Sequence, residues 1–201
     1  MREPGRGVRP RGQPVRTPAW AYWLISRRLL RCLLGGDLPA RDVRWVPRAP
    51  EGGPGGVVVE VGAGGGFYTG ALRRRCGTGA RLVVLDPFAG GVSRLRVRHG
   101  VSGVCADGQR LPLRDGSVDV LFYGYALEEF ADLDAAVAEA ARVLRPGGHL
   151  VLFLWRPLLP RQRRSGLFAR LNRDFLLLRA ADGPQNLRRS YRRRGLAEGS
   201  R

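Results

Sequence analysis

Residues 57–66 of this chain read Val-Val-Val-Glu-Val-Gly-Ala-Gly-Gly-Gly, and no other segment constrains the fold as strongly. The apolar run predicts a strand that is buried on both faces of a parallel sheet. Gly62, Gly64 and Gly66 allow a tight turn and let the backbone approach a ligand where a Cβ would clash. Glu60 stands two residues ahead of the first of these glycines. The layout predicts a small-molecule site at the end of the first strand of an α/β sheet.

Apolar runs alternate with amphipathic stretches from this segment to Trp155. The pattern predicts strands at 57–61, 81–85, 101–106, 118–123 and 149–155. It predicts helices near 67–75, 92–98 and 133–144, the last capped by Asp132 and ended by the Arg-Pro-Gly-Gly turn at 145–148. Strands that alternate with helices indicate βαβ units with right-handed crossovers. We therefore expect a Rossmann-like three-layer α/β sandwich around a mainly parallel sheet of about five strands.

The two ends of the chain differ in composition from its middle. Residues 1–16 are mostly Gly, Pro and Arg, which predicts a disordered basic tail. A helical cap is predicted over 17–46, with a helix from Pro18 to about Leu34, and the Gly- and Pro-rich residues 47–56 are interpreted as a linker. The main domain is predicted to span 57–179, with a helix at 167–179, and 180–201 to form a second basic tail without a strand.

The net charge of +18 raises the question of a nucleic-acid partner. The net charge is +4 over residues 1–18, +4 over 19–155 and +10 over 156–201, so the excess lies mainly at the ends. All 35 basic residues are Arg. Because Lys also binds phosphate well, the complete absence of Lys favours a compositional bias over selection for phosphate contacts. Nucleic-acid binding by the tails is therefore an alternative that is not favoured.

Several further features restrict the class of protein. No apolar stretch approaches about 18 residues, so no transmembrane span is predicted. The Arg- and Pro-rich N-terminus has no apolar segment followed by a small-residue cleavage site, which argues against a secretory signal. Cys32, Cys76 and Cys105 are odd in number and widely spaced, a pattern that suits neither a disulfide framework nor a zinc site. We expect free thiols, no metal and a cytoplasmic location.

Polar residues follow the predicted strands where each strand ends. They are Glu60 with the glycines, Asp86, Asp107, Tyr123 with Tyr125, and Trp155 with Arg156. In an open α/β sheet, ligands bind outside the carboxyl ends of the strands, so these residues are expected at one edge. His99 and His149 fall at the opposite edge, which disfavours a Ser-His-Asp hydrolase. Phe67 occupies the third glycine position of a dinucleotide fingerprint, so the loop departs from nicotinamide enzymes.

Five motifs in order identify the family that this chain resembles. They are Val-Glu-Val-Gly-Ala-Gly-Gly-Gly (59–66), Val-Leu-Asp-Pro (84–87), Ala-Asp-Gly-Gln-Arg-Leu-Pro-Leu (106–113), Asp-Gly-Ser-Val-Asp-Val-Leu (115–121) and Ala-Arg-Val-Leu-Arg-Pro-Gly-Gly-His-Leu-Val-Leu (141–152). On these motifs, the chain resembles the class I S-adenosylmethionine-dependent methyltransferases, in the subgroup related to the ubiquinone and menaquinone biosynthesis enzymes. The resemblance covers about residues 55–155.

The resemblance implies S-adenosyl-L-methionine as the cofactor and assigns roles around it. Glu60 is expected near the methionine end, and Gly62, Gly64 and Gly66 let the backbone pack against it. Asp86, which Pro87 follows, is expected to accept hydrogen bonds from both ribose hydroxyls. Asp107 is expected to bind the adenine amino group, with the backbone of Gly108 nearby. Tyr123 to Tyr125 are expected to pass close to the sulfonium and the substrate.

Three departures from the family pattern stand out. Gly91 occupies a position where relatives often have a bulky apolar residue over the adenine, so either the adenine is packed more weakly or Phe88 takes this role. Glu128 and Glu129 stand where relatives often have histidine. The antiparallel C-terminal hairpin that usually completes the fold is expected to be missing.

The resemblance implies methyl transfer to a small, apolar or aromatic metabolite. The catalytic base is left unknown by the sequence, and the candidates are Glu128, Glu129 and Tyr125. One alternative is a nucleic-acid methyltransferase that uses the Arg-rich tails, although no Asn/Asp-Pro-Pro-Tyr element follows 118–123. Another is a truncated cofactor-binding protein without turnover. Arg27, Arg28 and Arg31 also raise peripheral membrane contact through the N-terminal helix, and the oligomeric state stays open.

Overall fold

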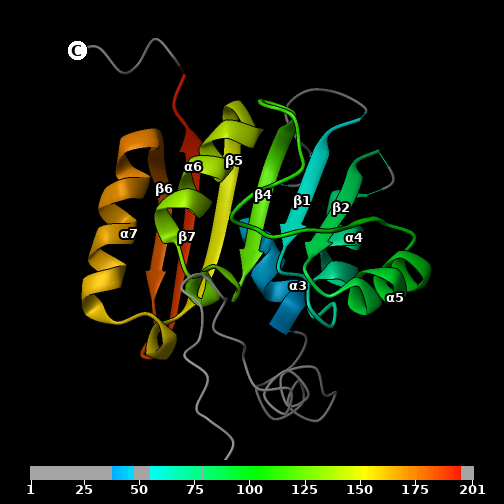
Figure 1. Ribbon diagram of the computed structural model, residues 1–201, viewed down its shortest axis with the longest axis horizontal. Coiled ribbons are helices and arrows are strands. Elements are labelled where there is room, and N and C mark those ends of the chain that lie inside the picture. Colours follow the sequence, from blue (N-terminus) through cyan, green and yellow to red (C-terminus); the bar gives the residue numbers. More distant parts are fainter. Residues whose placement is uncertain (1–37, 48–54, 78, 196–201) are drawn as a thin grey trace, which may run out of the picture.

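The computed structural model describes residues 38–47, 55–77 and 79–195. In this part of the chain, seven strands form one sheet in the order β3-β2-β1-β4-β5-β7-β6 (Figure 1). The strands are β1 (Val57–Val61), β2 (Arg81–Asp86), β3 (Ser102–Cys105), β4 (Val118–Gly124), β5 (Leu144–Trp155), β6 (Phe175–Asp182) and β7 (Asn186–Arg193). Strands β1 to β5 pair in parallel, and β7 runs antiparallel between β5 and β6.

Helices cover both faces of the sheet. One face carries α3 (Leu38–Asp42), the 3-10 turn η1 (Val43–Trp45), α4 (Thr69–Cys76) and α5 (Ala89–His99), and the other carries α6 (Leu133–Val143) and α7 (Arg161–Asp174). In Figure 1, α6 and α7 lie in front of the sheet. Two further 3-10 turns, η2 (Leu127–Glu129) and η3 (Arg156–Leu158), follow β4 and β5. This arrangement confirms the predicted three-layer α/β fold.

The two cores explain why the central strands are apolar throughout. Successive side chains of a strand point to opposite faces of the sheet. Val59 and Val61 pack into the core with α6 and α7, whereas Val58 packs into the core with α4 and α5. Because each central strand is buried on both faces, its sequence shows an apolar run in place of an alternating pattern.

The expectation that the C-terminal hairpin is missing is wrong. Strands β6 and β7 form this hairpin and raise the sheet to seven strands in the described residues, where the sequence predicted about five. The helix expected at 167–179 is α7, which begins earlier and ends at Asp174. The predicted boundary between residues 179 and 180 therefore falls inside β6, and residues 180–193 belong to the hairpin rather than to a tail.

The arginines of β7 explain why the sequence pattern did not predict a strand there. Its sequence, Asn-Leu-Arg-Arg-Ser-Tyr-Arg-Arg, contains two large apolar residues, Leu187 and Tyr191, which pack into the α6–α7 core. On the same face, the guanidinium of the buried Arg189 lies 4.8 Å from the ring centroid of Phe168. On the opposite face, Arg188 Nη2 lies 3.0 Å from Asp42 Oδ1. Partners from other elements thus make an Arg-rich sequence compatible with an interior strand.

Strand β5 begins five residues earlier than the sequence predicted. Val118 of β4 is opposite Leu144, but Val120 is already opposite His149, so residues 145–148 form an irregular insertion in the ladder. The expected helix cap is confirmed, because Asp132 Oδ1 accepts a hydrogen bond of 2.9 Å from the backbone N–H of Ala135.

The N-terminal expectations fall largely outside the described residues. These include the disordered tail at 1–16, the helix from residue 18 to 34 and most of the linker at 47–56. Of the expected cap at 17–46, the described part begins at α3, and Val43 and Val46 are buried in the α4–α5 core. None of the helices within the described ranges has the length and apolar character needed to cross a bilayer.

Candidate active site

The loop after β1 contains three glycines that have a left-handed backbone conformation. The φ angles are +71° at Gly62, +50° at Gly64 and +79° at Gly66. A Cβ at Gly62 would lie closer than 3.0 Å to the Cβ of Ala126, which follows β4. The N–H groups of Gly62 and Ala63 both donate to the carbonyl of Leu85, at 2.8 and 3.2 Å. The loop therefore crosses the carboxyl edge of β1 and β2, and residue 62 has to be glycine for both conformational and steric reasons.

Asp86 connects the two loops that meet at this edge. Its Oδ2 accepts the Gly64 N–H at 2.8 Å, and its Oδ1 accepts the Phe88 N–H at 2.9 Å. The residue is only 8% exposed. An ionised carboxylate has about four acceptor positions, so two remain for a ligand. The next residue, Pro87, is exposed at the rim.

Glu60 is buried beneath the glycine loop. Its Oε2 accepts a hydrogen bond of 2.6 Å from the hydroxyl of Thr69, the first residue of α4. Burial raises the pKa of Glu60 to about 8, and the charge of Asp86 adds to this shift while the Thr69 hydroxyl opposes it. The side chain thus joins the end of β1 to the start of α4, and its carboxyl group lies inside the protein.

The raised pKa of Glu60 predicts a pH-dependent stability. The folded state binds the Glu60 proton more tightly than the unfolded state does, and this binding stabilises the fold. The contribution to stability is fully present below the ordinary pKa of 4.5 and is lost as the pH rises through the folded-state pKa of about 8. We expect the unfolding free energy to fall over this window, by at most about 1.4 kcal/mol per pH unit for one proton. Glu60→Gln, which mimics the protonated group, should show a flatter profile in urea denaturation from pH 5 to 9. An equally steep profile in the variant would contradict this assignment.

The loop after β3 brings a second acid to the same edge. Asp107 is exposed, and its Oδ1 accepts the Gln109 N–H at 2.9 Å. Gly108 is buried, and a Cβ there would lie closer than 3.0 Å to both the Phe130 ring and Val61 at the end of β1. The loop after β3 therefore lies directly against the end of β1, as the shared edge of the sheet requires.

Close packing explains why residue 91 is glycine. A Cβ on Gly91 would lie 3.1 Å from the carbonyl oxygen of Gly64 and 3.2 Å from the Phe88 ring. A bulky side chain at this position would therefore displace the glycine loop. Phe88 lies beside Gly91 and is 61% exposed, so an aromatic surface is available next to Asp86.

Tyr123, near the end of β4, has a buried side chain. Tyr123 is fully buried in the α6–α7 core, and its hydroxyl has no hydrogen-bond partner among the described residues. Burial raises its pKa well above the ordinary range. Its side chain therefore packs inside this core, where its ring centroid lies 6.0 Å from that of Phe130.

Tyr125 has an unusual backbone and lies on the other face of the sheet. Its φ of +59° is uncommon for a bulky residue, and its N–H donates to the Phe153 carbonyl at 2.8 Å. The ring centroid lies 6.2 Å from those of Tyr68 and Phe153. Burial raises the pKa of Tyr125 to about 12. Its phenol is thus neutral at physiological pH and forms part of an aromatic wall.

Glu128 is a buried acid near the carboxyl end of β4. It lies in η2 and is 2% exposed, and its Oε1 accepts the Trp155 N–H at 2.7 Å. Its buried Oε2 has no hydrogen-bond partner in the described part of the protein. Burial raises its pKa to about 7. The neighbouring Glu129 is half-buried. The turn after β4 and the end of β5 are therefore linked by a carboxyl group that titrates near neutrality.

Sequence reasoning missed a buried polar network beside Tyr125. The Tyr68 hydroxyl donates to Asp42 Oδ2 at 2.9 Å, and Asp42 Oδ1 is ion-paired with Arg188. These residues come from α3, the residue before α4, and β7, so no spacing in the sequence indicates the network. It connects the N-terminal part of the described chain to the hairpin.

Comparisons with known proteins show similarity to methyltransferases. The family model described as a methyltransferase domain matches residues 59–152, which contain all five motifs. Just under half of this chain is therefore similar to a methyltransferase domain. The resemblance to methyltransferases that the motifs predict is thus confirmed.

Two curated relatives and one solved structure illustrate this similarity. A demethylmenaquinone methyltransferase of Corynebacterium urealyticum is 36% identical over 99 residues, 49% of this chain and 41% of that protein. A malonyl-(acyl-carrier protein) O-methyltransferase of Methylococcus capsulatus is 40% identical over 103 residues, 49% of this chain and 37% of that protein. The matches thus span about two fifths of these relatives. A crystal structure of a SAM-dependent methyltransferase from Aquifex aeolicus shares the fold, with a TM-score of 0.69 at 16% identity, covering 88% of this chain and 99% of that one.

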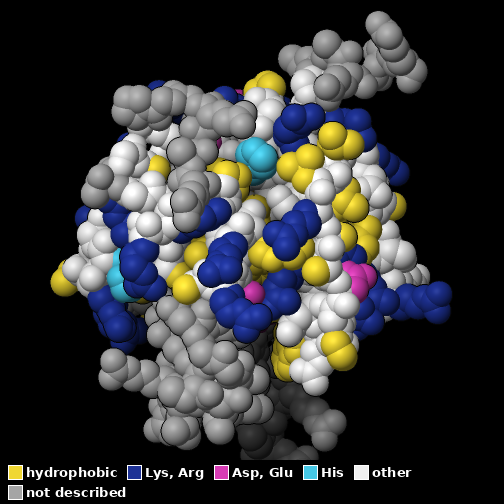
Figure 2. All heavy atoms as spheres, turned by 180° about the vertical axis from the view of Figure 1, so that it is seen from behind, with side chains coloured by type: hydrophobic (Ala, Val, Ile, Leu, Met, Phe, Trp, Pro, Cys, Tyr) yellow, Lys and Arg dark blue, Asp and Glu magenta, His cyan; other side chains and the backbone are white. Residues whose placement is uncertain are grey.

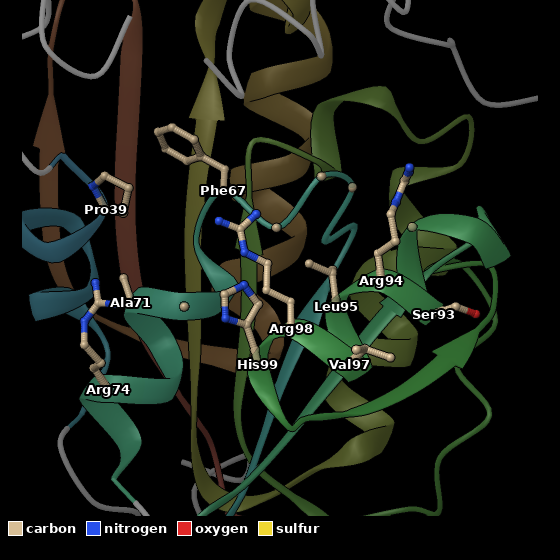
Figure 3. Close-up of a pocket in the computed structure, with 15 residues that line it drawn as sticks. Pro39, Phe67, Ala71, Arg74, Ser93, Arg94, Leu95, Val97, Arg98 and His99 are labelled. Atoms are coloured by element: carbon tan, nitrogen blue, oxygen red, sulfur yellow. The ribbon is translucent and has the colours of Figure 1, made fainter. Parts of the chain in front are cut away.

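A sizeable cavity in the described part of the chain lies beside the carboxyl edge rather than on it. It measures about 1150 Å³ and lies between α4 and α5, behind the glycine loop. Figure 3 shows Arg74 from α4 and Arg94, Arg98 and His99 from α5 around it. It shares Gly64 to Gly66 with the candidate site but is not lined by Asp86 or Asp107. The residues that meet at the carboxyl edge therefore define the candidate active site, and this cavity adjoins it.

Proposed function

We propose that this protein transfers a methyl group from S-adenosyl-L-methionine to a small, apolar or aromatic molecule. The observation that carries the proposal is the carboxylate of Asp86, which holds the glycine loop against the end of β2 at the carboxyl edge of a domain similar to methyltransferases. This edge is where open α/β sheets bind their ligands.

The residues at this edge fit the cofactor. Bare backbone at Gly62 to Gly66 allows close approach, and Asp86 keeps acceptor positions for two ribose hydroxyls. In this proposal the exposed Phe88 ring contacts the adenine ring, and the exposed Asp107 carboxylate accepts a hydrogen bond from the adenine amino group. Glu60 supports the loop through Thr69. When bound, the cofactor supplies a methyl group on a sulfonium, a leaving group that needs little further activation.

The surroundings of the site favour an apolar acceptor. Tyr125 and Phe67 lie beside Tyr68 on one side, and Trp155 is the last residue of β5. Aromatic side chains of this kind line pockets for apolar and aromatic ligands. The relatives named for demethylmenaquinone support an isoprenoid quinol as the substrate class. The relatives reported above are named for small-molecule or acyl-carrier substrates, so they do not support a nucleic-acid acceptor.

A protein without turnover is a weaker alternative in the light of the fold. That alternative was motivated by a missing hairpin and by Gly91. The hairpin is present as β6 and β7, and Gly91 follows from close packing against Gly64. Both reasons for expecting an incomplete site are therefore removed.

Among the three candidate bases, we propose Glu128. The raised pKa of Tyr125 makes its phenolate scarce at neutral pH, whereas Glu128 has a pKa of about 7. A general base works best when its pKa lies near the working pH. Trp155 N–H holds Oε1, which leaves Oε2 to accept the proton of an acceptor hydroxyl as the methyl group is transferred. The proton taken by the carboxylate balances the positive charge lost from the sulfonium.

The test compares Glu128→Gln with Glu129→Gln as a matched control. The amide introduced by Glu128→Gln keeps an acceptor for Trp155 N–H but cannot take a proton. With the quinol form of demethylmenaquinone as the acceptor, we expect kcat to fall about 100-fold in Glu128→Gln. The rise of kcat toward neutral pH should disappear, while cofactor affinity by calorimetry stays unchanged. The control should keep the wild-type profile. Full activity in Glu128→Gln would remove Glu128 as the base, and no cofactor binding at millimolar concentration would overturn the proposed function.

A further inference from the structure

The outer edge of the sheet exposes three consecutive leucines. Strand β6 is the last strand of the sheet, and Leu176, Leu177 and Leu178 are 37, 44 and 46% exposed. We call these three residues the β6 leucine edge. Figure 2 shows hydrophobic side chains gathered on the right of the rear face, over the β6–β7 end of the sheet, with Lys and Arg side chains around them. An exposed apolar patch rimmed by charge indicates an interaction surface.

The charges around the β6 leucine edge are positive. Arg192 of β7 is directly opposite Leu176 and is exposed, and Arg173 and Arg179 stand before and after the leucines. The Arg179 guanidinium lies 4.0 Å from the ring centroid of Trp45, which holds it against the rear face. Asp174, the residue before β6, is ion-paired with Arg170, and Asp182, the last residue of β6, is ion-paired with Arg189. The edge therefore combines apolar side chains with positive charge.

The geometry of the edge disfavours pairing with another strand. The ladder between β6 and β7 shifts register between Leu177 and Arg179, so Leu178 is an extra residue in a bulge. Bulges of this kind protect an edge strand against addition of a further strand. A second copy of the chain would also bring arginines against arginines. Both observations argue against a dimer through this edge.

The leucines point in different directions. Leu176 and Leu177 alternate across the strand and so point to opposite faces of the sheet, and the bulge turns Leu178 out of the ladder. A flat protein surface cannot contact all three side chains together, whereas a fluid lipid layer can surround them. The unpaired backbone groups of the edge strand restrict insertion to the hydrated interface. We propose that the β6 leucine edge docks this protein on anionic lipid bilayers, with Arg173, Arg179 and Arg192 contacting the headgroups.

The test is co-sedimentation of the full chain with phosphatidylcholine vesicles, with and without phosphatidylglycerol. We expect binding only when the anionic lipid is present, and weaker binding at high salt. The double variant Leu176→Ser/Leu178→Ser should bind about tenfold more weakly, since it removes two inserting side chains. Arg192→Gln should lose about fivefold at low salt and little at high salt.

Matched variants separate this surface from a general effect of composition. Val97→Ser removes an apolar side chain that is 88% exposed on α5, and Arg114→Gln removes an exposed charge before β4. Both should bind vesicles like the wild type, and circular dichroism should show that all variants are folded. Wild-type binding by the double leucine variant, or a change in oligomeric state in place of a change in vesicle binding, would overturn the proposal. Vesicle binding requires no methyl transfer, so its failure would leave the proposed function intact.

Discussion

Replacing Asp86 by alanine is expected to weaken S-adenosyl-L-methionine binding by about 100-fold or more. The carboxylate supplies acceptors for ligand hydroxyls, and it also holds the Gly64 and Phe88 N–H groups at 2.8 and 2.9 Å. Hydrogen bonds to a charged group contribute about 1.5–3 kcal/mol each, and about 1.4 kcal/mol corresponds to a tenfold change in affinity. Isothermal titration calorimetry with the cofactor measures the effect directly.

Two further variants make the Asp86 experiment specific. Asp86→Asn keeps one acceptor but turns an amide donor toward one of the two N–H groups, so its affinity should lie between those of the wild type and Asp86→Ala. Asp115→Ala removes an exposed acid that is ion-paired with Arg142 and should leave cofactor affinity unchanged. Wild-type affinity in a folded Asp86→Ala protein would show that the cofactor does not bind at this edge.

Gly62→Ala is expected to destabilise the fold by about 2–4 kcal/mol. The residue has a φ of +71°, and its new Cβ would lie closer than 3.0 Å to Ala126. A left-handed alanine costs about 1 kcal/mol, and forcing an additional carbon into a packed region typically adds about 1–3 kcal/mol. Urea denaturation of the apo protein gives the free energy of unfolding. Cofactor affinity should fall as well, because the loop has to shift.

Gly100→Ala provides a matched control for the conformational part of this effect. Gly100 follows α5 in the left-handed αL conformation with a φ of +60°, and nothing lies within 4 Å of the position of its Cβ. The variant should therefore show the cost of the left-handed conformation alone, about 1 kcal/mol. Equal losses in the two variants would show that close packing against Ala126 does not contribute.

The sequence was sufficient for the central half of the fold. Strands that are buried on both faces, such as β1, need a run of apolar residues, so they are visible without any tertiary information. The glycine loop and Asp86 were predictable for a related reason. A left-handed backbone and a carboxylate at a strand end restrict the residue type locally. The bounds of α4 and α6 also followed within a few residues.

The C-terminal hairpin was not predictable in the same way. Strand β7 is interior to the sheet but contains four arginines, whose compatibility with burial depends on Asp42, Phe153 and Phe168 from distant elements. Strand β6 reads as an extension of the preceding helix until its pairing with β7 is known. A sequence pattern describes a segment's own side chains, whereas these strands are stabilised by the partners of those side chains.

For the candidate site as well, the sequence predicted some features and only the fold determined the others. The sequence by itself determined the family resemblance, the parallel core and the identity of the residues at the ends of β1, β2 and β3, because each depends on local backbone conformation or on burial on both faces. Only the tertiary structure decided the environment of each acid. It placed Glu60 beneath the loop, turned Tyr123 into the core and buried Glu128 against Trp155. The pKa of a carboxyl group depends on the water and charges around it, and the chain acquires those surroundings only when it folds.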